Sequence, residues 1–327
     1  MTIEVENVKG FYMYNYLIDT HCDTAYEIYK RNENLTQNTC HISLEKAKVF
    51  DKYAQFFAIW SDKKKSDEQA FEDFLKIRDD FKNQISNNSL GVRFVTSFDG
   101  MNSAWNENKA AAFLAVEDAR ILANNLDRLD ILHQSGVKYL TLMWGGSTCI
   151  GGSHNVDGGL TPFGKAVVEK CFDIGIVPDI SHANYDTASD VIELAYKHNK
   201  PIIASHSNSY SLYPHTRNLR DEHVHAIVEL GGIIGVSLCP YHLTDTNKKV
   251  CDVSDVVDHI IKYISLGAEN NIGLGCDLDG TELPSGFNSI ADLKLISNEL
   301  SQRGISDSVI DKILYENYYN FIKNNFN

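Results

Sequence analysis

The chain has 327 residues, of which 43% are hydrophobic and 23% are charged, as is usual for a globular protein. This length accommodates one α/β barrel of about 250 residues with extensions, and it allows a large core without disulfide bonds. The formal net charge of −14 argues against nucleic acid or an anionic membrane surface as the main partner.

Apolar runs of strand length alternate with stretches of helical periodicity along the chain. The expected strands cover residues 16–20, 54–60, 112–116, 138–142, 176–180, 201–205, 232–237 and 271–276. The expected helices cover 66–86, 122–134, 162–173, 185–198, 219–230 and 254–266, with a shorter one within 41–50 and two or three within 289–324. This alternation is typical of a parallel sheet with crossover helices.

The alternation favours a (β/α)8 barrel over a doubly wound open sheet. Neither G-x-G-x-x-G nor G-x-x-x-x-G-K-[ST] follows the first expected strand, so the usual nucleotide-binding signals are missing. The glycine-rich segment 145–159 is interpreted as a long active-site loop, because the same rhythm continues on both sides of it. We therefore expect residues 1–327 to form a single (β/α)8 barrel domain with C-terminal helices.

Local sequence also predicts several helix ends. Thr161-Pro162 is typical of a helix start, with a threonine cap and proline at the first helical position. Gly175 follows a helical pattern, where glycine commonly adopts the left-handed conformation that ends a helix. Asn184 or Asp186 is expected to cap the next helix.

The cysteines and the N-terminal residues predict a cytoplasmic location. The seven cysteines are scattered with no C-x-x-C pair, which indicates reduced thiols. The first 20 residues have no basic region followed by an apolar core, so no signal peptide is expected. No window approaches the roughly 18 consecutive apolar residues of a membrane span, so no membrane partner is expected.

His21 and Asp23 follow the first expected strand in the segment DTHCDT. Because side chains alternate along a strand, these two point to the same side and Cys22 to the other. An imidazole and a carboxylate with this spacing provide half of a divalent-metal site. Short H-x-D matches are also common by chance. The residues at the other strand ends therefore decide between a metal site and a chance match.

Four further ionisable residues end other expected strands: Glu117, His182, His206 and Asp277. Each alone has an ordinary structural explanation, since strand-end histidines often form hydrogen bonds and GCDLDG also suits a turn. In a parallel barrel, however, the C-terminal strand ends converge on one cavity. Imidazoles and carboxylates without thiolates suit zinc, iron, manganese or cobalt, and five ligands suit two metals sharing a carboxylate, with Glu117 as the natural bridge.

Five separated segments carry a family resemblance: IDTHCDT at 18–24, AVED at 115–118, GLTPFGKAVVEKCFDIGIVPDISH at 159–182, IIASHSNSYSLYPHTRNLRDE at 202–222 and IGLGCDLDG at 272–280. From about residue 17 to its end, the chain resembles the membrane dipeptidase (renal dipeptidase) family of zinc peptidases, peptidase family M19. The resemblance implies a (β/α)8 barrel that binds two Zn²⁺ per chain and hydrolyses dipeptides through a metal-bridging hydroxide. It also implies a homodimer.

The resemblance assigns roles to individual residues. Five become metal ligands in two sets that share one carboxylate: His21 and Asp23 at one zinc, His182 and His206 at the other, and Glu117 as the bridge. Asp277 matches the acid/base aspartate. Arg217, in HTRN, matches the arginine that holds the substrate carboxylate, a role that suits a guanidinium.

One position departs from the family pattern. After YLTL, renal-type members carry Thr-His, where this chain has Met143-Trp144. An indole donates one hydrogen bond, to an oxyanion for example, but it cannot accept a proton. His154 in the GGSH loop is a candidate to replace that histidine by reaching into the site. The alternative is that the His154 side chain is exposed to solvent. We expect this change to leave the metal site intact, whereas its effect on the substrate range and the rate of hydrolysis is not predicted.

Two other functions stay open at the level of sequence. A related binuclear amidohydrolase acting on N-acyl amino acids, lactams or lactones would share the metal ligands. A metal-binding homologue without catalysis would explain Trp144, although the presence of both Asp277 and Arg217 argues against it. A role in binding nucleic acid has no support.

Overall fold

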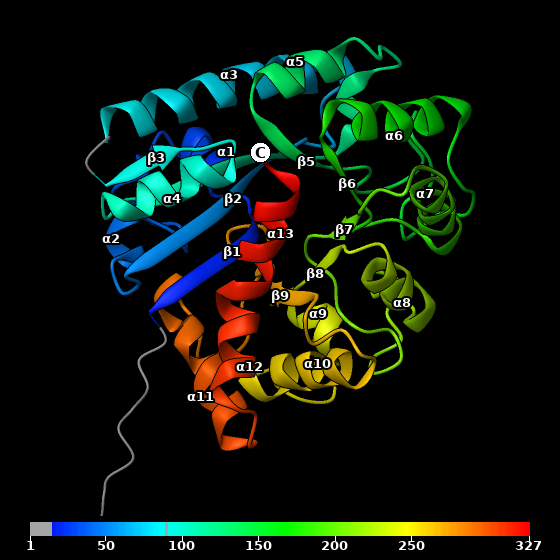
Figure 1. Cartoon of the computed structure of the whole chain (residues 1–327). Helices are drawn as coiled ribbons and strands as arrows, with labels where there is room; N and C mark the ends of the chain where they lie inside the picture. The colour runs from blue at the N-terminus through cyan, green and yellow to red at the C-terminus, as the bar shows by residue number, and fades with distance from the viewer. Residues whose placement is uncertain (1–14, 89–90) are drawn as a thin grey trace, which may run out of the picture.

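The computed structural model describes residues 15–88 and 91–327, and within them nine parallel strands form the centre of the molecule (Figure 1). They are β1 (Tyr16–Cys22), β2 (Lys52–Trp60), β3 (Val92–Phe94), β4 (Ala110–Glu117), β5 (Val137–Thr141), β6 (Val177–Asp179), β7 (Ile203–Ala204), β8 (Ile233–Val236) and β9 (Ile272–Leu274). The order β2-β1-β9-β8-β7-β6-β5-β4 closes on itself because β2 also pairs with β4. The predicted (β/α)8 barrel is confirmed.

Strand β3 was not predicted, and it lies outside the closed ring. It pairs with the first residues of β4, from Val92 opposite Ala110 to Phe94 opposite Ala112. The ladder between β4 and β5 begins only at Leu114. Strands β3 and β5 therefore share one edge of β4, and three residues are too few to show a strand pattern in sequence.

Helices surround the barrel, and most of the expected ones are present (Figure 1). The helical segments are α1 (Thr24–Arg31), α2 (Leu44–Ala47), α3 (Asp67–Asn87), α4 (Phe98–Asn106), η1 (Ala119–Leu122), α5 (Arg128–Gln134), α6 (Pro162–Ile174), α7 (Tyr185–His198), α8 (Asp221–Glu229), α9 (Pro240–Leu243), α10 (Val253–Ser265), η2 (Ile290–Leu293), α11 (Lys294–Gln302), α12 (Asp307–Asp311), η3 (Lys312–Glu316) and α13 (Asn317–Asn325). In the described part of the chain, none combines the length and apolarity needed to cross a bilayer. The N-terminal residues 1–14, where no signal peptide was expected, lie outside the described residues.

The expectation of one helix over 122–134 is wrong. A short 3-10 helix, η1, ends at Leu122, and α5 begins only at Arg128. Ala123 and Asn124 adopt left-handed φ values of 47° and 58°, which interrupt the helix. The apolar periodicity of the sequence continues across this break. The helix is interrupted nevertheless, because these two residues do not have helical backbone angles. Helices α1 and α4 were also missed.

The predicted helix ends agree with the structure. The Thr161 hydroxyl accepts a hydrogen bond from the backbone N–H of Gly164, with Pro162 in the first turn of α6. Gly175 ends α6 at φ 77°. Asn184, and not Asp186, caps α7 by accepting from the N–H of Thr187.

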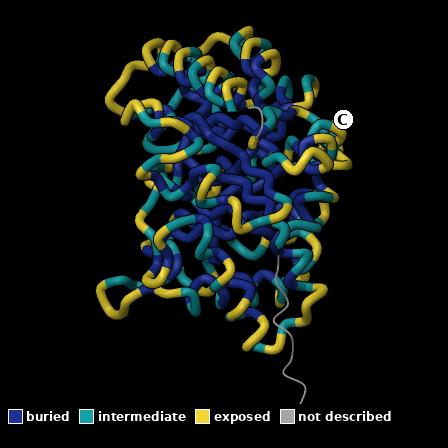
Figure 2. Tube along the Cα trace, turned by 90° about the vertical axis from the view of Figure 1, so that its left-hand side faces the viewer, coloured by how far each residue is buried: buried dark blue, intermediate teal, exposed yellow. Residues whose placement is uncertain are grey.

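Helix α13 seals the N-terminal end of the barrel. The inner core contains strand side chains that precede the polar strand ends, including Ile18, Phe56 and Phe113, together with Tyr318 of α13 and Phe326 just after that helix. The Phe326 ring centroid lies 6.1 Å from that of Phe56 and 6.2 Å from that of Phe113. The strands form the buried centre of the molecule in Figure 2. With this end filled, the polar strand ends lie at the opposite end of the barrel.

Replacing Phe326 by alanine tests this plug. The side chain is fully buried, so Phe326→Ala is expected to lower the free energy of unfolding by about 3–5 kcal/mol. Urea denaturation measures the loss, with Asn324→Ala on the exposed side of α13 as the control. An unchanged unfolding midpoint for Phe326→Ala would show that α13 contributes little to the core.

Candidate metal centre

Five side chains from the ends of four strands, β1, β4, β6 and β7, converge at the open end of the barrel. His21 is the penultimate residue of β1 and Asp23 directly follows that strand, Glu117 ends β4, and His182 and His206 follow β6 and β7. None of the five is more than 9% exposed. Cys22 points away, as expected, and its Sγ lies 3.6 Å from the carbonyl oxygen of Phe56. The structure therefore brings together every residue predicted as a metal ligand.

The two oxygens of Glu117 face different imidazoles. Oε2 lies 3.5 Å from Nε2 of His21. Oε1 lies 2.9 Å from Nε2 of His182 and 3.4 Å from Nε2 of His206. A carboxylate divided in this way has the arrangement needed to bridge two cations.

The donor set fits divalent metal ions. Two groups, His21–Asp23–Glu117 and Glu117–His182–His206, each hold ligand atoms within 4.8 Å of one another, and a third group contains His21, His206 and Asp277. Nε2 of His21 and Oδ1 of Asp23 are buried without a hydrogen-bond partner. Buried polar atoms are rarely left unpaired, so these two atoms support a bound cation. Imidazole and carboxylate donors are those of catalytic zinc and related metals.

Each imidazole is oriented by a hydrogen bond at Nδ1, which leaves Nε2 facing the centre. His21 bonds the hydroxyl of Tyr139 at 2.8 Å, and His206 bonds the hydroxyl of Ser205 at 2.8 Å. His182 donates to the carbonyl oxygen of Trp144 at 3.0 Å. Such partners fix ring orientation in metal sites.

Asp179 anchors the strand ends on which two of the histidines lie. Its Oδ1 accepts from the N–H groups of Ser181 and Ser205, and its Oδ2 accepts from the hydroxyls of Thr141 and Ser205. Sequence reasoning missed this residue and Tyr139. A buried aspartate in PDISH is a visible signal, whereas Tyr139 looks like any other strand residue.

Three residues at the centre adopt left-handed backbone conformations. The φ values are 68° for His182, 59° for Asp277 and 70° for Asp279. Residues other than glycine rarely adopt this region, and such residues cluster at functional sites. The N–H of Asp277 donates to the carbonyl oxygen of His21 at 3.1 Å, which ties the turn after β9 to β1.

Burial and mutual attraction shift the pKa values of the acidic groups and of His21. Burial raises the pKa of Glu117, but the charge of His21 and hydrogen bonds from the imidazoles bring it well below its usual value. Burial lowers the pKa of His21, and attraction to Glu117 and its neighbours reverses this and raises it to about 10. Burial and repulsion by Glu117 raise the pKa of Asp23, and burial raises the pKa of Asp277 to about 7. The cluster therefore favours bound positive charge.

The other two histidines favour the neutral form. Burial, followed by repulsion from Arg217, lowers the pKa of His182 to about 4. Burial, followed by repulsion from His21, lowers the pKa of His206 well below its usual value. Neutral imidazole is the form that binds metal ions.

An acidic cavity of about 230 Å³ opens onto the centre. Its lining residues, which define it hereafter, are Asp23, Tyr26, Glu27, Trp60, Glu117, Trp144, His182, Asp277, Asp279 and Gly280. Trp144 packs edge-to-face on Trp60, with ring centroids 5.3 Å apart. Its indole lies beside the centre, where the sequence comparison predicted a substrate contact.

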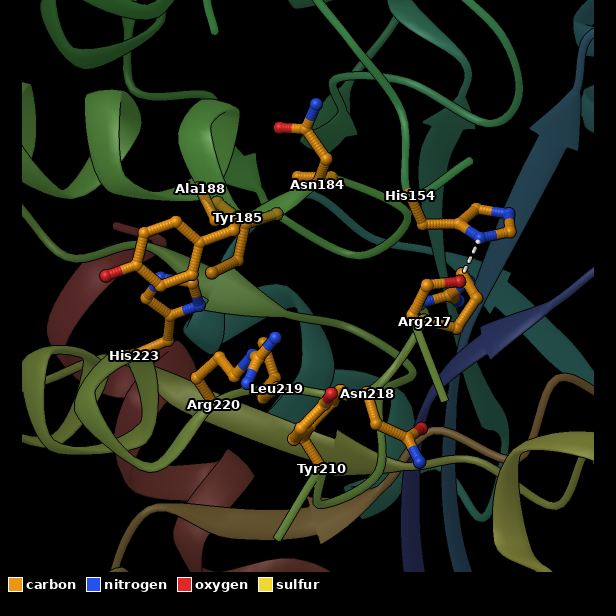
Figure 3. A pocket seen from close by; sticks show the side chains of 13 residues that line it. His154, Asn184, Tyr185, Ala188, Tyr210, Arg217, Asn218, Leu219, Arg220 and His223 are labelled. Carbon is orange, nitrogen blue, oxygen red and sulfur yellow. Dashed lines mark hydrogen bonds between the residues drawn. The ribbon is translucent and has the colours of Figure 1, made fainter. Parts of the chain in front are cut away.

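A second, basic cavity of about 140 Å³ lies around Arg217 (Figure 3). Its lining residues, which define it hereafter, are His154, Ile180, Ala183, Asn184, Tyr185, Ala188, Tyr210, Thr216, Arg217, Asn218, Leu219, Arg220 and His223. His154 lies here, with Nδ1 3.1 Å from the Thr216 hydroxyl, and its ring centroid is 6.1 Å from that of His182. Burial lowers the pKa of His154 to about 3. His154 therefore lies beside Arg217 and outside the acidic cavity.

Arg217 is a buried cation with few partners. Its Nη2 donates to the carbonyl oxygen of His206 at 3.1 Å, and Nη1 lies 3.4 Å from the hydroxyl of Ser207. Nε has no hydrogen-bond partner, and no ion pair joins the guanidinium to a carboxylate of the described residues. Burial lowers its pKa. Such a group is suited to receive an anion from outside the protein.

Sequence comparison decides the family. A sequence model of the membrane dipeptidase family, peptidase family M19, matches residues 6–325. The chain belongs to this family. Membership confirms the resemblance found in the sequence.

The sequence identity between this chain and individual members of the membrane dipeptidase family is low. Dipeptidase tcpJ of Claviceps purpurea is 31% identical over 213 residues, which cover 63% of this chain and 49% of that protein. The chain thus spans about half the length of this curated relative.

Two solved structures show the same fold. Dipeptidase AC, a metallo-peptidase of family M19, has a TM-score of 0.88 at 22% identity, covering 95% of this chain and 98% of the other. A Rhodobacter sphaeroides metallo-peptidase, liganded with a phosphinate mimic of L-Ala-D-Ala, has a TM-score of 0.86 at 22% identity, covering 94% and 99%.

Gly280 provides a test of the carboxylate positions. A Cβ atom at this residue would collide with Oδ2 of Asp23 and Oδ1 of Asp277. Gly280→Ala is therefore expected to displace both carboxylates and to weaken metal binding by about 10–100-fold. Metal titration monitored by calorimetry measures the change.

Gly145→Ala is the matched control, because a Cβ there meets no atom within 4 Å. Circular dichroism should report an unchanged fold for both variants. Metal affinity that is equal in Gly280→Ala and the wild type would mean that Asp23 is not held in a binding position.

Proposed function

We propose that the protein is a zinc-dependent dipeptidase that hydrolyses the peptide bond of dipeptides. The observation that carries this proposal is Glu117, which belongs to two ligand groups at once. Membership of the M19 family supports the same chemistry.

His21 and Asp23 would hold one metal, His182 and His206 the other, and Glu117 both. Bound divalent metals supply a polarised carbonyl and a water of lowered pKa. The protein orients this chemistry through the Nδ1 partners of the three imidazoles.

The two cavities suit the two ends of a zwitterionic dipeptide. Arg217 in the basic cavity binds the C-terminal carboxylate through its unpartnered guanidinium edge. The carboxylates of the acidic cavity favour the N-terminal ammonium, with Glu27 already paired to Arg31 and Asp279 accepting from the Thr24 hydroxyl and the His41 N–H. The Rhodobacter sphaeroides relative with its L-Ala-D-Ala mimic supports a substrate of this size. A free carboxylate so close to the scissile bond disfavours longer peptides.

Asp277 moves the proton. Its carboxylate lines the acidic cavity, with Oδ1 3.8 Å from Nε2 of His21, so it lies where it can accept a proton from the attacking water and return it to the leaving amine. The Trp144 indole donates a hydrogen bond to the developing oxyanion. His154 supports the carboxylate end of the substrate, since it lies beside Arg217.

We also propose a cytoplasmic homodimer. The seven cysteines, all within the described residues, are free thiols, in keeping with a reducing compartment. The dimer rests on the family resemblance, and light scattering tests it.

The function is tested by zinc reconstitution and a hydrolysis panel of dipeptides, tripeptides and N-acyl amino acids. We expect the wild type to bind two zinc ions and to prefer dipeptides. Asp277→Asn is expected to keep its zinc and to lose turnover by about 100- to 10,000-fold, because it removes proton transfer alone.

Other outcomes would redirect the proposal. Loss of zinc in Asp277→Asn would make Asp277 a ligand, as in the group with His21 and His206. A preference for N-acyl amino acids, lactams or lactones would indicate a related amidohydrolase. Zinc binding without any hydrolysis would indicate a non-catalytic homologue.

A further inference from the structure

The basic cavity contrasts with the rest of the chain. The protein has 44 acidic residues and a net charge of −14, yet no Asp or Glu occurs among the described residues that line this cavity. Arg217 and Arg220 both line it. Two cations without a carboxylate favour an anionic ligand, because a buried or half-buried charge is costly without a partner.

Arg220 is held at the cavity without an ion pair. Its guanidinium carbon lies 3.5 Å from the centroid of the Tyr210 ring, and Figure 3 shows it between Tyr210 and the Tyr185–His223 pair. The nearest acidic neighbour in sequence, Asp221, accepts from the Ser211 hydroxyl at 2.7 Å and pairs with Lys262 at 3.7 Å. Among the described residues, none forms a hydrogen bond or salt bridge with the Arg220 guanidinium, whereas the backbone carbonyl oxygen of Arg220 accepts from the N–H of Val224 in α8.

Arg220 also occupies an unusual position in its helix. It is the N-cap of α8, where no side-chain cap is formed. Ser, Thr, Asp or Asn at this position typically stabilises a helix by about 1 kcal/mol relative to residues that cannot cap. The arginine therefore gives α8 no capping benefit, whereas it does supply positive charge to the cavity.

Two buried polar atoms at the same cavity have no hydrogen-bond partner. They are Nε of Arg217 and Oδ1 of Asn218, in residues that are 4% and 7% exposed. The amide nitrogen of Asn218 is held by the carbonyl oxygens of Tyr213 and His242, so its Oδ1 is the free end. The unpaired N–H of Arg217 is a donor that suits an anionic group, whereas Oδ1 of Asn218 is an acceptor and would pair with a donor of the ligand, such as a backbone N–H.

We propose that the basic cavity receives the side chain of the C-terminal residue of the substrate and that Arg220 selects an acidic one. This inference rests on the proposed function, since it uses the binding of the α-carboxylate by Arg217. One α-carboxylate satisfies one guanidinium, and a side-chain carboxylate satisfies the other. The preferred substrates are dipeptides that end in aspartate or glutamate.

The test compares Ala-Glu with its uncharged isostere Ala-Gln, each with a C-terminal residue of L or D configuration. The wild type, loaded with zinc, is expected to hydrolyse the better Ala-Glu isomer with a kcat/KM at least about tenfold above that for Ala-Gln, the scale of one charge-assisted hydrogen bond. Arg220→Met should bring this ratio close to one, and Arg220→Lys should restore part of it. Arg93→Met, remote from both cavities, removes the same charge and should leave the ratio unchanged.

Binding provides a second readout that does not need turnover. Calorimetry on the zinc-loaded Asp277→Asn variant should show tighter binding of Ala-Glu than of Ala-Gln, and adding Arg220→Met should remove the difference. Equal affinity for the two peptides, or an acidic preference that survives Arg220→Met, would overturn the inference. Failure to hydrolyse either peptide, with the binding difference intact, would instead overturn the proposed dipeptidase activity.

Discussion

The carboxylate of Glu117 is the point on which the arrangement of the site depends. It ends β4, the strand whose pairing with β2 closes the barrel. Its two oxygens face His21 on one side and His182 with His206 on the other. A buried carboxylate is stable only among positive charges or strong donors, so closure of the barrel around Glu117 creates a demand for cations at its C-terminal end.

The rest of the fold holds this end in place and leaves it accessible. Tyr318 of helix α13 and Phe326 just after it fill the opposite end, so the interior of the barrel is apolar at its base and polar at its mouth. Asp179 ties β6 and β7 together below the two histidines that follow them. The acidic cavity includes Glu117 and His182 of the centre, whereas the basic cavity is lined by Arg217 and Arg220.

The sequence predicted the barrel and singled out the five side chains that converge at its strand ends, because each signal is local. A strand is recognised by its own apolar run, and His21, Glu117 and His206 each follow such a run directly. The break between η1 and α5 was missed because it depends on the backbone of Ala123 and Asn124 and not on hydrophobic pattern. Local sequence patterns also do not predict contacts between distant segments, such as the hydrogen bond between the Tyr139 hydroxyl and Nδ1 of His21.

The positions of Trp144 and His154 show the same limit. The family resemblance pointed to Trp144, and His154 lies in the predicted active-site loop 145–159, but only tertiary structure separates them into two cavities. Arg220 was not singled out at all, since an arginine after HTRNL looks like an ordinary helix start. Its significance comes from the absence of any carboxylate among the described residues lining its cavity.

The central claim is that two metal ions share Glu117, and zinc stoichiometry of Glu117→Gln tests it most directly. Atomic absorption after reconstitution should find two zinc ions per wild-type chain, a loss at both positions in Glu117→Gln, and a loss at one position in His206→Ala. Two tightly bound zinc ions retained by Glu117→Gln, or only one bound by the wild type, would contradict a bridging carboxylate.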